Sequence, residues 1–153
     1  MADKQLDRAE LMDALSIAGR KISTYTVLFS QAAADRMGMN ATDMECGDIL
    51  SWTGPITAGR LAELSGLTTG AITGVIDRLE RAGFVRREKD PTDRRRVIVM
   101  PLQERYDEVM PLYQGMIHSM NEFTDRYTEQ ELAVLLDFTT KMGNVLFDEA
   151  VKL

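Results

Sequence analysis

The sequence predicts a mainly α-helical protein with one small β-hairpin and long helices at both ends of the chain. Apolar residues recur in steps of three and four over residues 7–37, which is typical of a helix packed against other helices. Two short helical segments with a glycine-containing turn follow between residues 57 and 83. Two β-branched runs then flank a turn at residues 90–96. This order predicts a winged helix-turn-helix core within a helical frame.

The length of 153 residues fits one compact domain. Within it we expect an N-terminal dimerisation helix at 1–38, the winged helix-turn-helix at 39–102 and C-terminal dimerisation helices at 103–153. No run of residues approaches the roughly 18 apolar residues of a membrane-spanning helix, and the polar, acidic N-terminus is unlike a secretion signal. We therefore expect a cytoplasmic protein with no membrane partner.

The N-terminal half contains three predicted helices. The first covers residues 7–37 and ends before Gly38. Thr42 and Glu45 have the spacing of a capping box, which predicts a second helix that ends at Gly54-Pro55. Thr57 opens a third, short helix. The first helix has an apolar stripe formed by Leu11, Leu15, Ala18, Ile22, Tyr25, Phe29 and Ala32.

The fourth helix and the hairpin follow directly. Thr68 is the expected N-cap of the fourth helix and Gly83 ends it. The segments FVRRE and VIVMP are the expected strands, and KDPTDRRR between them has the composition of a turn. The buried stripe of the fourth helix is expected to be Ile72, Val75, Ile76 and Leu79.

The last third of the chain is expected to be helical again. Pro111 lacks a backbone N–H, so we expect a break near Met110. Thr128 and Glu131 form a second predicted capping box, which starts the last helix. One face of that helix is apolar and consists of Leu132, Leu135, Leu136, Thr139, Met142 and Leu146.

Charge is distributed unevenly along the chain. Residues 57–105 contain ten Lys and Arg against seven Asp and Glu, a local +3, while the whole chain has a net charge of −6. A basic segment in an acidic protein indicates a local contact with a polyanion. Arg94, Arg95 and Arg96 lie at the tip of the predicted hairpin, where a guanidinium can enter the narrow minor groove of DNA. We expect Asp93 or Asp90 to orient one of them.

The N-terminal half of the fourth helix has unusually small residues. Each interior glycine costs about 1 kcal/mol relative to alanine, so Gly70 and Gly74 require an explanation. One is the close approach of DNA, which Thr69 and Thr73 could contact at phosphates or base edges. The other is tight packing of the helix on its neighbour.

The stretch LAELSGLTTGAITGVIDRLERAGFVRR, followed by DPTDRRRVIV, resembles the MarR family of bacterial transcriptional regulators. The long flanking helices match as well, so the resemblance covers essentially the whole chain. It implies a triangular homodimer whose first and last helices form the interface. The fourth helix would read the major groove and the wing the minor groove. Many such regulators are repressors released by small phenolic or lipophilic ligands, or by oxidation.

The resemblance also suggests which residues contact DNA. Arg78 lies where relatives place a phosphate-contacting or wing-supporting arginine, and Asp93 matches the aspartate of the wing. The stem arginines Arg86 and Arg87 could meet phosphates together with Lys89. Pro101-Leu102 departs from the usual Leu-Thr of the family, which leaves the start of the fifth helix open. The predicted DNA-binding set is Thr68, Thr69, Gly70, Thr73, Arg78, Arg86, Arg94, Arg95 and Arg96.

We therefore expect a homodimeric, sequence-specific regulator that binds a pseudo-palindromic operator in double-stranded DNA. The alternative is a winged-helix module that binds protein and not DNA, because a fold does not determine function. Such a module has no need of an arginine-rich wing.

Other functional classes have weak support. No nucleophile or phosphate-loop motif indicates an enzyme, and one histidine with one cysteine makes no convincing metal site, so we expect neither metal nor cofactor. Cys46 is flanked by Glu45 and Asp48, which favours helix packing over oxidation sensing. The resemblance places an effector pocket between the dimer helices and the DNA-binding lobe. Its candidate lining, for which ordinary core packing is the alternative, is Tyr25, Phe29, Trp52, Tyr113, Met116 and His118.

Overall fold

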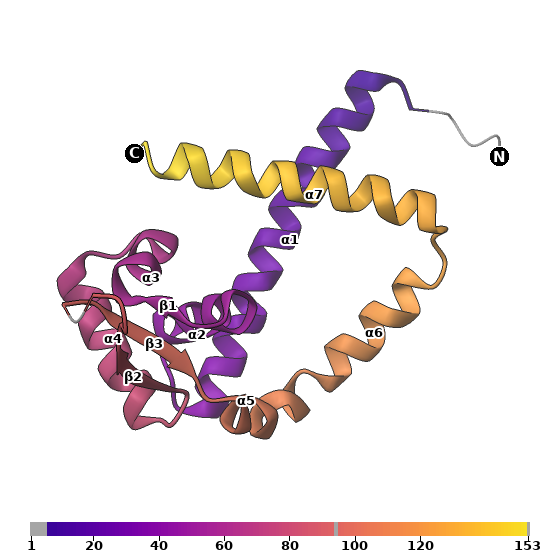
Figure 1. Cartoon of the computed structure of the whole chain (residues 1–153). Coiled ribbons are helices and arrows are strands. Elements are labelled where there is room, and N and C mark those ends of the chain that lie inside the picture. Colours follow the sequence, from indigo (N-terminus) through magenta and orange to yellow (C-terminus); the bar gives the residue numbers. More distant parts are fainter. Residues whose placement is uncertain (1–5, 94, 153) are drawn as a thin grey trace.

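The computed structural model describes residues 6–93 and 95–152 (Figure 1). A winged-helix unit occupies the middle of the chain, and the helices that precede and follow it in the sequence extend from it (Figure 1). The helices are α1 (Arg8–Met37), α2 (Ala41–Thr53), α3 (Ala58–Ser65), α4 (Thr69–Arg81), α5 (Gln103–Val109), α6 (Gln114–Thr124) and α7 (Glu129–Ala150). A short 3₁₀ turn, η1 (Met110–Leu112), separates α5 from α6. The strands are β1 (Ile56–Thr57), β2 (Val85–Lys89) and β3 (Val97–Pro101).

Most helix boundaries follow local capping interactions. The side chains of Thr57, Thr68 and Thr128 each accept a hydrogen bond from a backbone N–H in the first turn of α3, α4 and α7, as predicted. Asp7 and Glu10 form a capping box at the start of α1, and Gly38 ends that helix in the left-handed conformation with a φ of 65°.

The predicted start of the second helix is wrong. α2 begins after Asn40, whose side chain accepts a hydrogen bond of 2.8 Å from the backbone N–H of Asp43. Thr42, expected to be the cap, lies inside the first turn, so the predicted capping box with Glu45 does not form. Asn is at least as good an N-cap as Thr, and it lies where the chain leaves Gly38 in an extended conformation.

The small sheet has one strand more than predicted. In the described residues its order is β1-β3-β2, with antiparallel pairing throughout. Ile56 and Arg87 both face Val99 across the sheet. β1 is only two residues long, too short for an alternating pattern to reveal it in the sequence.

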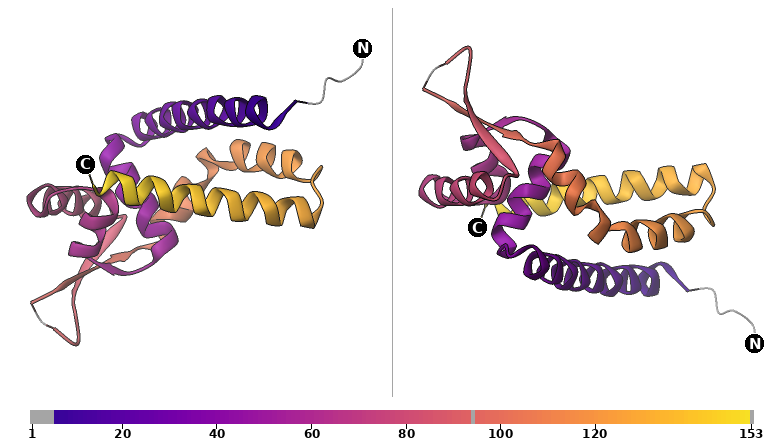
Figure 2. Two further views of the ribbon diagram at one scale, coloured as in Figure 1. Left: turned by 90° about the horizontal axis from the view of Figure 1, so that it is seen from above. Right: turned by 90° about the horizontal axis from the view of Figure 1, so that it is seen from below.

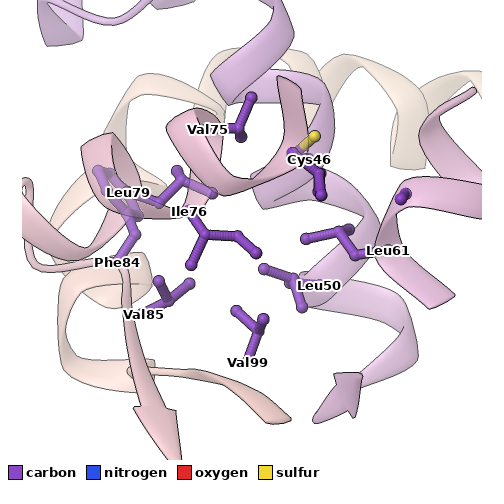
Figure 3. Close-up of a cluster of buried hydrophobic side chains, with 11 residues drawn as sticks. Cys46, Leu50, Leu61, Val75, Ile76, Leu79, Phe84, Val85 and Val99 are labelled. Carbon is purple, nitrogen blue, oxygen red and sulfur yellow. The ribbon is translucent and has the colours of Figure 1, made fainter. Parts of the chain in front are cut away.

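The core of the winged-helix unit lies between α2, α3, α4 and the sheet (Figure 3). All four residues of the predicted stripe on α4 are at most 2% exposed, which confirms the helical period. They pack with Cys46 and Leu50 of α2, Leu61 of α3, and Phe84, Val85 and Val99 of the hairpin. This packing fixes which face of α4 is turned outward.

The predicted break in the C-terminal third is confirmed. α5 ends at Val109, and Pro111 lies in η1, where its missing N–H removes no helical hydrogen bond. The structure also defines the start of the fifth helix, which Pro101-Leu102 left open in the sequence. β3 runs to Pro101 and α5 begins at Gln103. α1, α6 and α7 extend from the winged-helix unit on the side opposite the hairpin tip (Figure 2).

Candidate nucleic-acid interface

The N-terminal half of α4 presents a polar, small-residue surface to solvent. Burial of Ile72 and Val75 on the inner side leaves Thr69, Gly70 and Thr73 on the outer side, and all three are exposed. The hydroxyl of Thr73 donates to the carbonyl of Thr69 at 3.0 Å, which leaves its oxygen able to accept a further hydrogen bond. The N-terminal end of α4 therefore offers hydroxyl groups and a positive helix dipole to a ligand.

The packing explanation for the glycines of α4 fails in the structure. A Cβ built on Gly70 would have no described atom within 4 Å beyond its chain neighbours and the adjacent backbone of α4. On Gly74 it would meet the end of the Arg78 side chain at 3.4 Å, a contact that a flexible group can relieve. No neighbouring helix of the described chain requires either glycine, so packing within the chain does not explain them.

The wing is a hairpin whose tip is held by two carboxylates. Asp90 accepts hydrogen bonds from the N–H and the hydroxyl of Thr92 at 2.7 and 2.6 Å. These bonds to Thr92 are the main reason that the pKa of Asp90 is below its ordinary value. The turn is thereby closed on one side, and the tip projects away from the helices (Figure 2).

Asp93 orients the arginines at the tip, as the sequence predicts. Its carboxylate accepts from the backbone N–H and from Nε of Arg95 at 3.1 and 3.2 Å, and it lies 3.5 Å from Nε of Arg96. The hydrogen bonds from Arg95 lower the pKa of Asp93. The Arg95 side chain nevertheless remains 91% exposed, so its guanidinium is held in place while still open to a polyanion. Arg94 lies outside the described residues.

The two stem arginines have different surroundings. Arg86 pairs with Glu88 on the same strand at 2.7 Å and its side chain is 59% exposed. Arg87 instead donates to Asp77 and Glu80 of α4 and is only 28% exposed. Arg87 therefore holds the wing against α4. It is not the free phosphate contact that its position in the sequence suggests. The acidic pair at Asp77 and Glu80, one turn apart on α4, is the signal that could have revealed this role.

Arg78 joins α4 to α2. Its Nε and Nη2 donate to the two oxygens of Asp43, each at 2.8 Å. The Asp43 side chain is 5% exposed, whereas that of Arg78 is 43% exposed. The pair therefore fixes the recognition helix to α2 and leaves one side of the guanidinium accessible.

An apolar cavity of about 190 Å³ lies beneath α2, between the end of α1 and helices α5 and α6. Tyr113 and Met116 from the predicted ligand set line it. Phe29 meets the ring of Tyr113 edge-on at 5.5 Å but does not itself line the cavity. The cavity lining does not include Tyr25, Trp52 or His118. The full lining is Met37, Met39, Met44, Gly47, Asp48, Ser51, Phe84, Tyr106, Val109, Met110, Tyr113, Met116 and Ile117.

Cys46 lies in the core and is fully buried. Burial is the main cause that raises the pKa of its thiol, so the reactive thiolate is disfavoured. Within residues 6–93 and 95–152, no three His, Cys, Asp or Glu side chains are grouped so that they could hold a metal ion. No helix in the same ranges combines the length and the apolar character needed to cross a membrane.

Comparisons with known proteins agree with this geometry. Residues 39–97, the winged-helix unit, match the MarR family. An uncharacterized HTH-type transcriptional regulator of Bacillus subtilis (strain 168), YcgE, is 42% identical over 146 residues, covering 95% of each chain. The transcriptional regulator BldR from Sulfolobus solfataricus has a TM-score of 0.62 at 24% identity, over 91% of this chain and 99% of that one. Reduced AbfR bound to DNA has a TM-score of 0.58 at 16% identity, over 91% and 96%.

The family match and the sequence relative agree in function as well as in fold, since both describe transcriptional regulators and neither describes an enzyme. The winged helix of this chain has an exposed tip at α4 and an arginine-bearing wing. The chain therefore belongs to the MarR family of transcriptional regulators and is a DNA-binding regulator.

Proposed function

We propose that the protein is a homodimeric, sequence-specific repressor that a small lipophilic or phenolic ligand releases from a pseudo-palindromic operator. The observation that supports it most directly is the Asp93-oriented, 91% exposed Arg95 at the tip of the wing. An arginine that needs no further partner within its own turn, yet remains open to solvent, is suited to a nucleic acid groove.

In the proposed complex each part of the winged helix has its own contact. Thr69, Gly70 and Thr73 meet base edges and phosphates in the major groove, and Thr68 and the N–H groups of the first turn add phosphate contacts. Arg95 and Arg96, with Arg94, occupy the adjacent minor groove. Arg86 and the accessible side of Arg78 contact the backbone. A structural relative, AbfR, is described as bound to DNA.

The proposed dimer is supported by apolar surface that the single chain leaves uncovered. The α1 residues Leu15 and Ile22 are 49% and 66% exposed, and the α7 residues Leu136 and Leu146 are 68% and 64% exposed. Apolar surface of this extent on helices far from the core is typical of an interface between protein chains. A symmetric pair would place two α4 helices about 34 Å apart, the spacing of successive major grooves on one side of DNA.

The proposed release by ligand has a physical route through α2. This helix contributes Met44, Gly47 and Asp48 to the cavity, and its Asp43 holds Arg78 of the recognition helix. A ligand that binds one position of α2 better than another shifts α4 toward the preferred arrangement. The loss of DNA affinity cannot exceed the difference in ligand affinity between the two arrangements.

The test is a mobility-shift titration of Arg95→Ala on the DNA upstream of the protein's own gene, at several salt concentrations. We expect weaker binding than wild type and a slope of log affinity against log salt that is smaller by about 1 per wing. Lys141→Ala, which removes the same charge from α7, is the matched control and should bind as wild type does. Binding that is unchanged in Arg95→Ala, or insensitive to salt, would contradict the proposal.

A further inference from the structure

The cavity beneath α2 has an apolar lining whose charge, among the described residues, is negative. Five of its thirteen lining residues are methionine, and Phe84, Tyr106 and Tyr113 add three aromatic side chains. Asp48 is the charged residue of the lining, and among the described residues no Lys, Arg or His joins it. His118, next in sequence to the lining residue Ile117, faces Glu122 on α6 at 3.6 Å.

The Asp48 carboxylate has no partner in the part of the chain that the structure describes. Ser51 donates to the backbone carbonyl of Asp48, at 2.7 Å, and not to its side chain. Loss of surrounding water raises the pKa of the Asp48 carboxyl, although the residue stays open to solvent on one side. An ionised group placed against apolar walls without a counter-charge is unfavourable until a cation meets it.

Two tyrosines share this environment. Burial, followed by the charge of Asp48, raises the pKa of Tyr106 to about 12 and also raises that of Tyr113. Both phenols therefore remain neutral at physiological pH. The Tyr106 hydroxyl already donates to the carbonyl of Gly47 at 3.1 Å. The cavity is thus lined by aromatic side chains and polarisable sulfur beside one unpaired carboxylate, although the guanidinium of Arg105 already lies over the Phe84 ring at 5.2 Å.

We propose that this cavity binds a lipophilic cation, with the charged nitrogen beside Asp48 and the apolar part among the methionines and aromatic rings. The inference deepens the proposed control by ligand and rests on it for its regulatory consequence. Aromatic faces attract cations through the ring quadrupole, and unbranched methionines adapt to apolar groups of varied shape.

The same lining disfavours the other ligand classes. A phenolate or a carboxylate would lie near Asp48 without a positive partner from the lining and would be repelled. A neutral lipophilic molecule would fill the space but leave the Asp48 carboxylate unpaired and less hydrated than before. A neutral hydroxyl can donate a hydrogen bond to the Asp48 carboxylate, but only a cation also compensates its charge.

The experiment uses isothermal titration calorimetry on the full-length protein with three probes of similar shape. These are phenyltrimethylammonium, its neutral carbon analogue tert-butylbenzene, and the anion 4-tert-butylbenzoate. We expect the affinity order cation, neutral analogue, anion. Asp48→Asn should weaken binding of the cation by about tenfold and should not weaken that of tert-butylbenzene, because no carboxylate is then dehydrated. Glu45→Gln, which removes a carboxylate from the same helix outside the cavity, is the matched control and should bind like wild type.

The outcomes separate this inference from the proposed function. Equal losses in Asp48→Asn and Glu45→Gln, tighter binding of the anion, or no cation binding by the folded protein would overturn the cation site. A mobility shift with phenyltrimethylammonium then tests the consequence, and we expect release of DNA from Asp48→Asn to need about tenfold more of this cation than release from wild type. Cation binding at Asp48 without release of DNA would leave the site in place and overturn the proposed ligand control.

Discussion

At the scale of single residues, the asymmetric burial of the pair between Asp43 and Arg78 predicts an asymmetric response to mutation. Asp43 is 5% exposed in its side chain and Arg78 is 43% exposed. Arg78→Met leaves a buried carboxylate that keeps only the hydrogen bond from the Asn40 amide at 2.9 Å and loses its counter-charge, which should cost about 3 kcal/mol of folding free energy. Asp43→Asn leaves a guanidinium that water can reach and should cost about 1–2 kcal/mol.

Urea unfolding at neutral pH of both single variants and the double variant measures this difference. We expect the double variant to lose less than the sum of the single losses, with a coupling of at least about 1 kcal/mol. Additive losses, or a larger loss for Asp43→Asn than for Arg78→Met, would show that the pair does not stabilise the junction of α2 and α4.

Asp48 gives a second prediction at this scale, for the pH dependence of stability. Because loss of water raises its pKa in the folded protein, the folded chain retains this proton to higher pH than the unfolded chain. The contribution of the Asp48 carboxyl to the free energy of unfolding therefore decreases as the pH rises above the ordinary aspartate pKa of about 3.9. We expect Asp48→Asn to be more stable than wild type near neutral pH.

Chemical unfolding of wild type and Asp48→Asn at a series of pH values measures this gain. The difference between the two proteins should shrink as the pH falls toward 4, because the wild-type carboxyl is then protonated too. A constant difference across the series, or a less stable Asp48→Asn at neutral pH, would contradict the prediction.

At the scale of secondary-structure elements, α4 combines a well-packed inner face with an outer face that carries a helix-destabilising glycine. Since no described atom beyond its chain neighbours and the adjacent backbone of α4 lies within 4 Å of a Cβ at Gly70, Gly70→Ala should stabilise the free protein by up to about 1 kcal/mol. The added methyl group lies on the surface proposed to approach DNA. We therefore expect the same substitution to weaken DNA binding by about tenfold.

Thermal unfolding and mobility shift on the same preparations test both halves of this prediction. Gly115→Ala on α6, where the described residues also leave open space, should raise stability without changing DNA affinity. Stabilisation by Gly70→Ala with undiminished DNA binding would exclude close approach of DNA as the reason for that glycine.

At the scale of the whole molecule, the helices outside the winged-helix unit lack a core of their own. The described residues of α5, α6 and α7 include none that is buried, and α1 buries only Ala33 and Ala34. Residues of the apolar stripes predicted on α1 and α7, such as Ile22 and Leu136, are exposed, and the described residues of the single chain do not cover them. We expect a second copy to supply them.

The double variant Leu136→Glu with Leu146→Glu tests this expectation. Four buried charges in a symmetric interface should convert the dimer to monomer in sedimentation velocity and abolish tight operator binding. Lys141→Glu, at a charged position of the same helix, should remain dimeric. A monomeric wild-type protein, or a double variant that still sediments as a dimer, would contradict the proposed assembly.

The sequence alone determined the winged helix, nearly all helix boundaries, the hairpin and the break at Pro111, because each depends on residues within a few positions of one another. Capping by Thr57, Thr68 and Thr128 acts over three residues, and the stripe of α4 repeats every turn. The orientation of Arg95 by Asp93 is equally local. Even here two local caps competed at the start of α2, and Asn40 prevailed over Thr42.

The tertiary structure alone decided which charged groups remain available to a partner. Arg86 and Arg87 are neighbours in sequence, but opposite faces of a strand send one to solvent and the other to Asp77 and Glu80. Asp43 and Arg78 meet across 35 positions. The cavity with its unpaired Asp48 gathers side chains from α1, α2, α5 and α6. Such contacts depend on how elements pack, and the spacing of residues along a chain does not encode that packing.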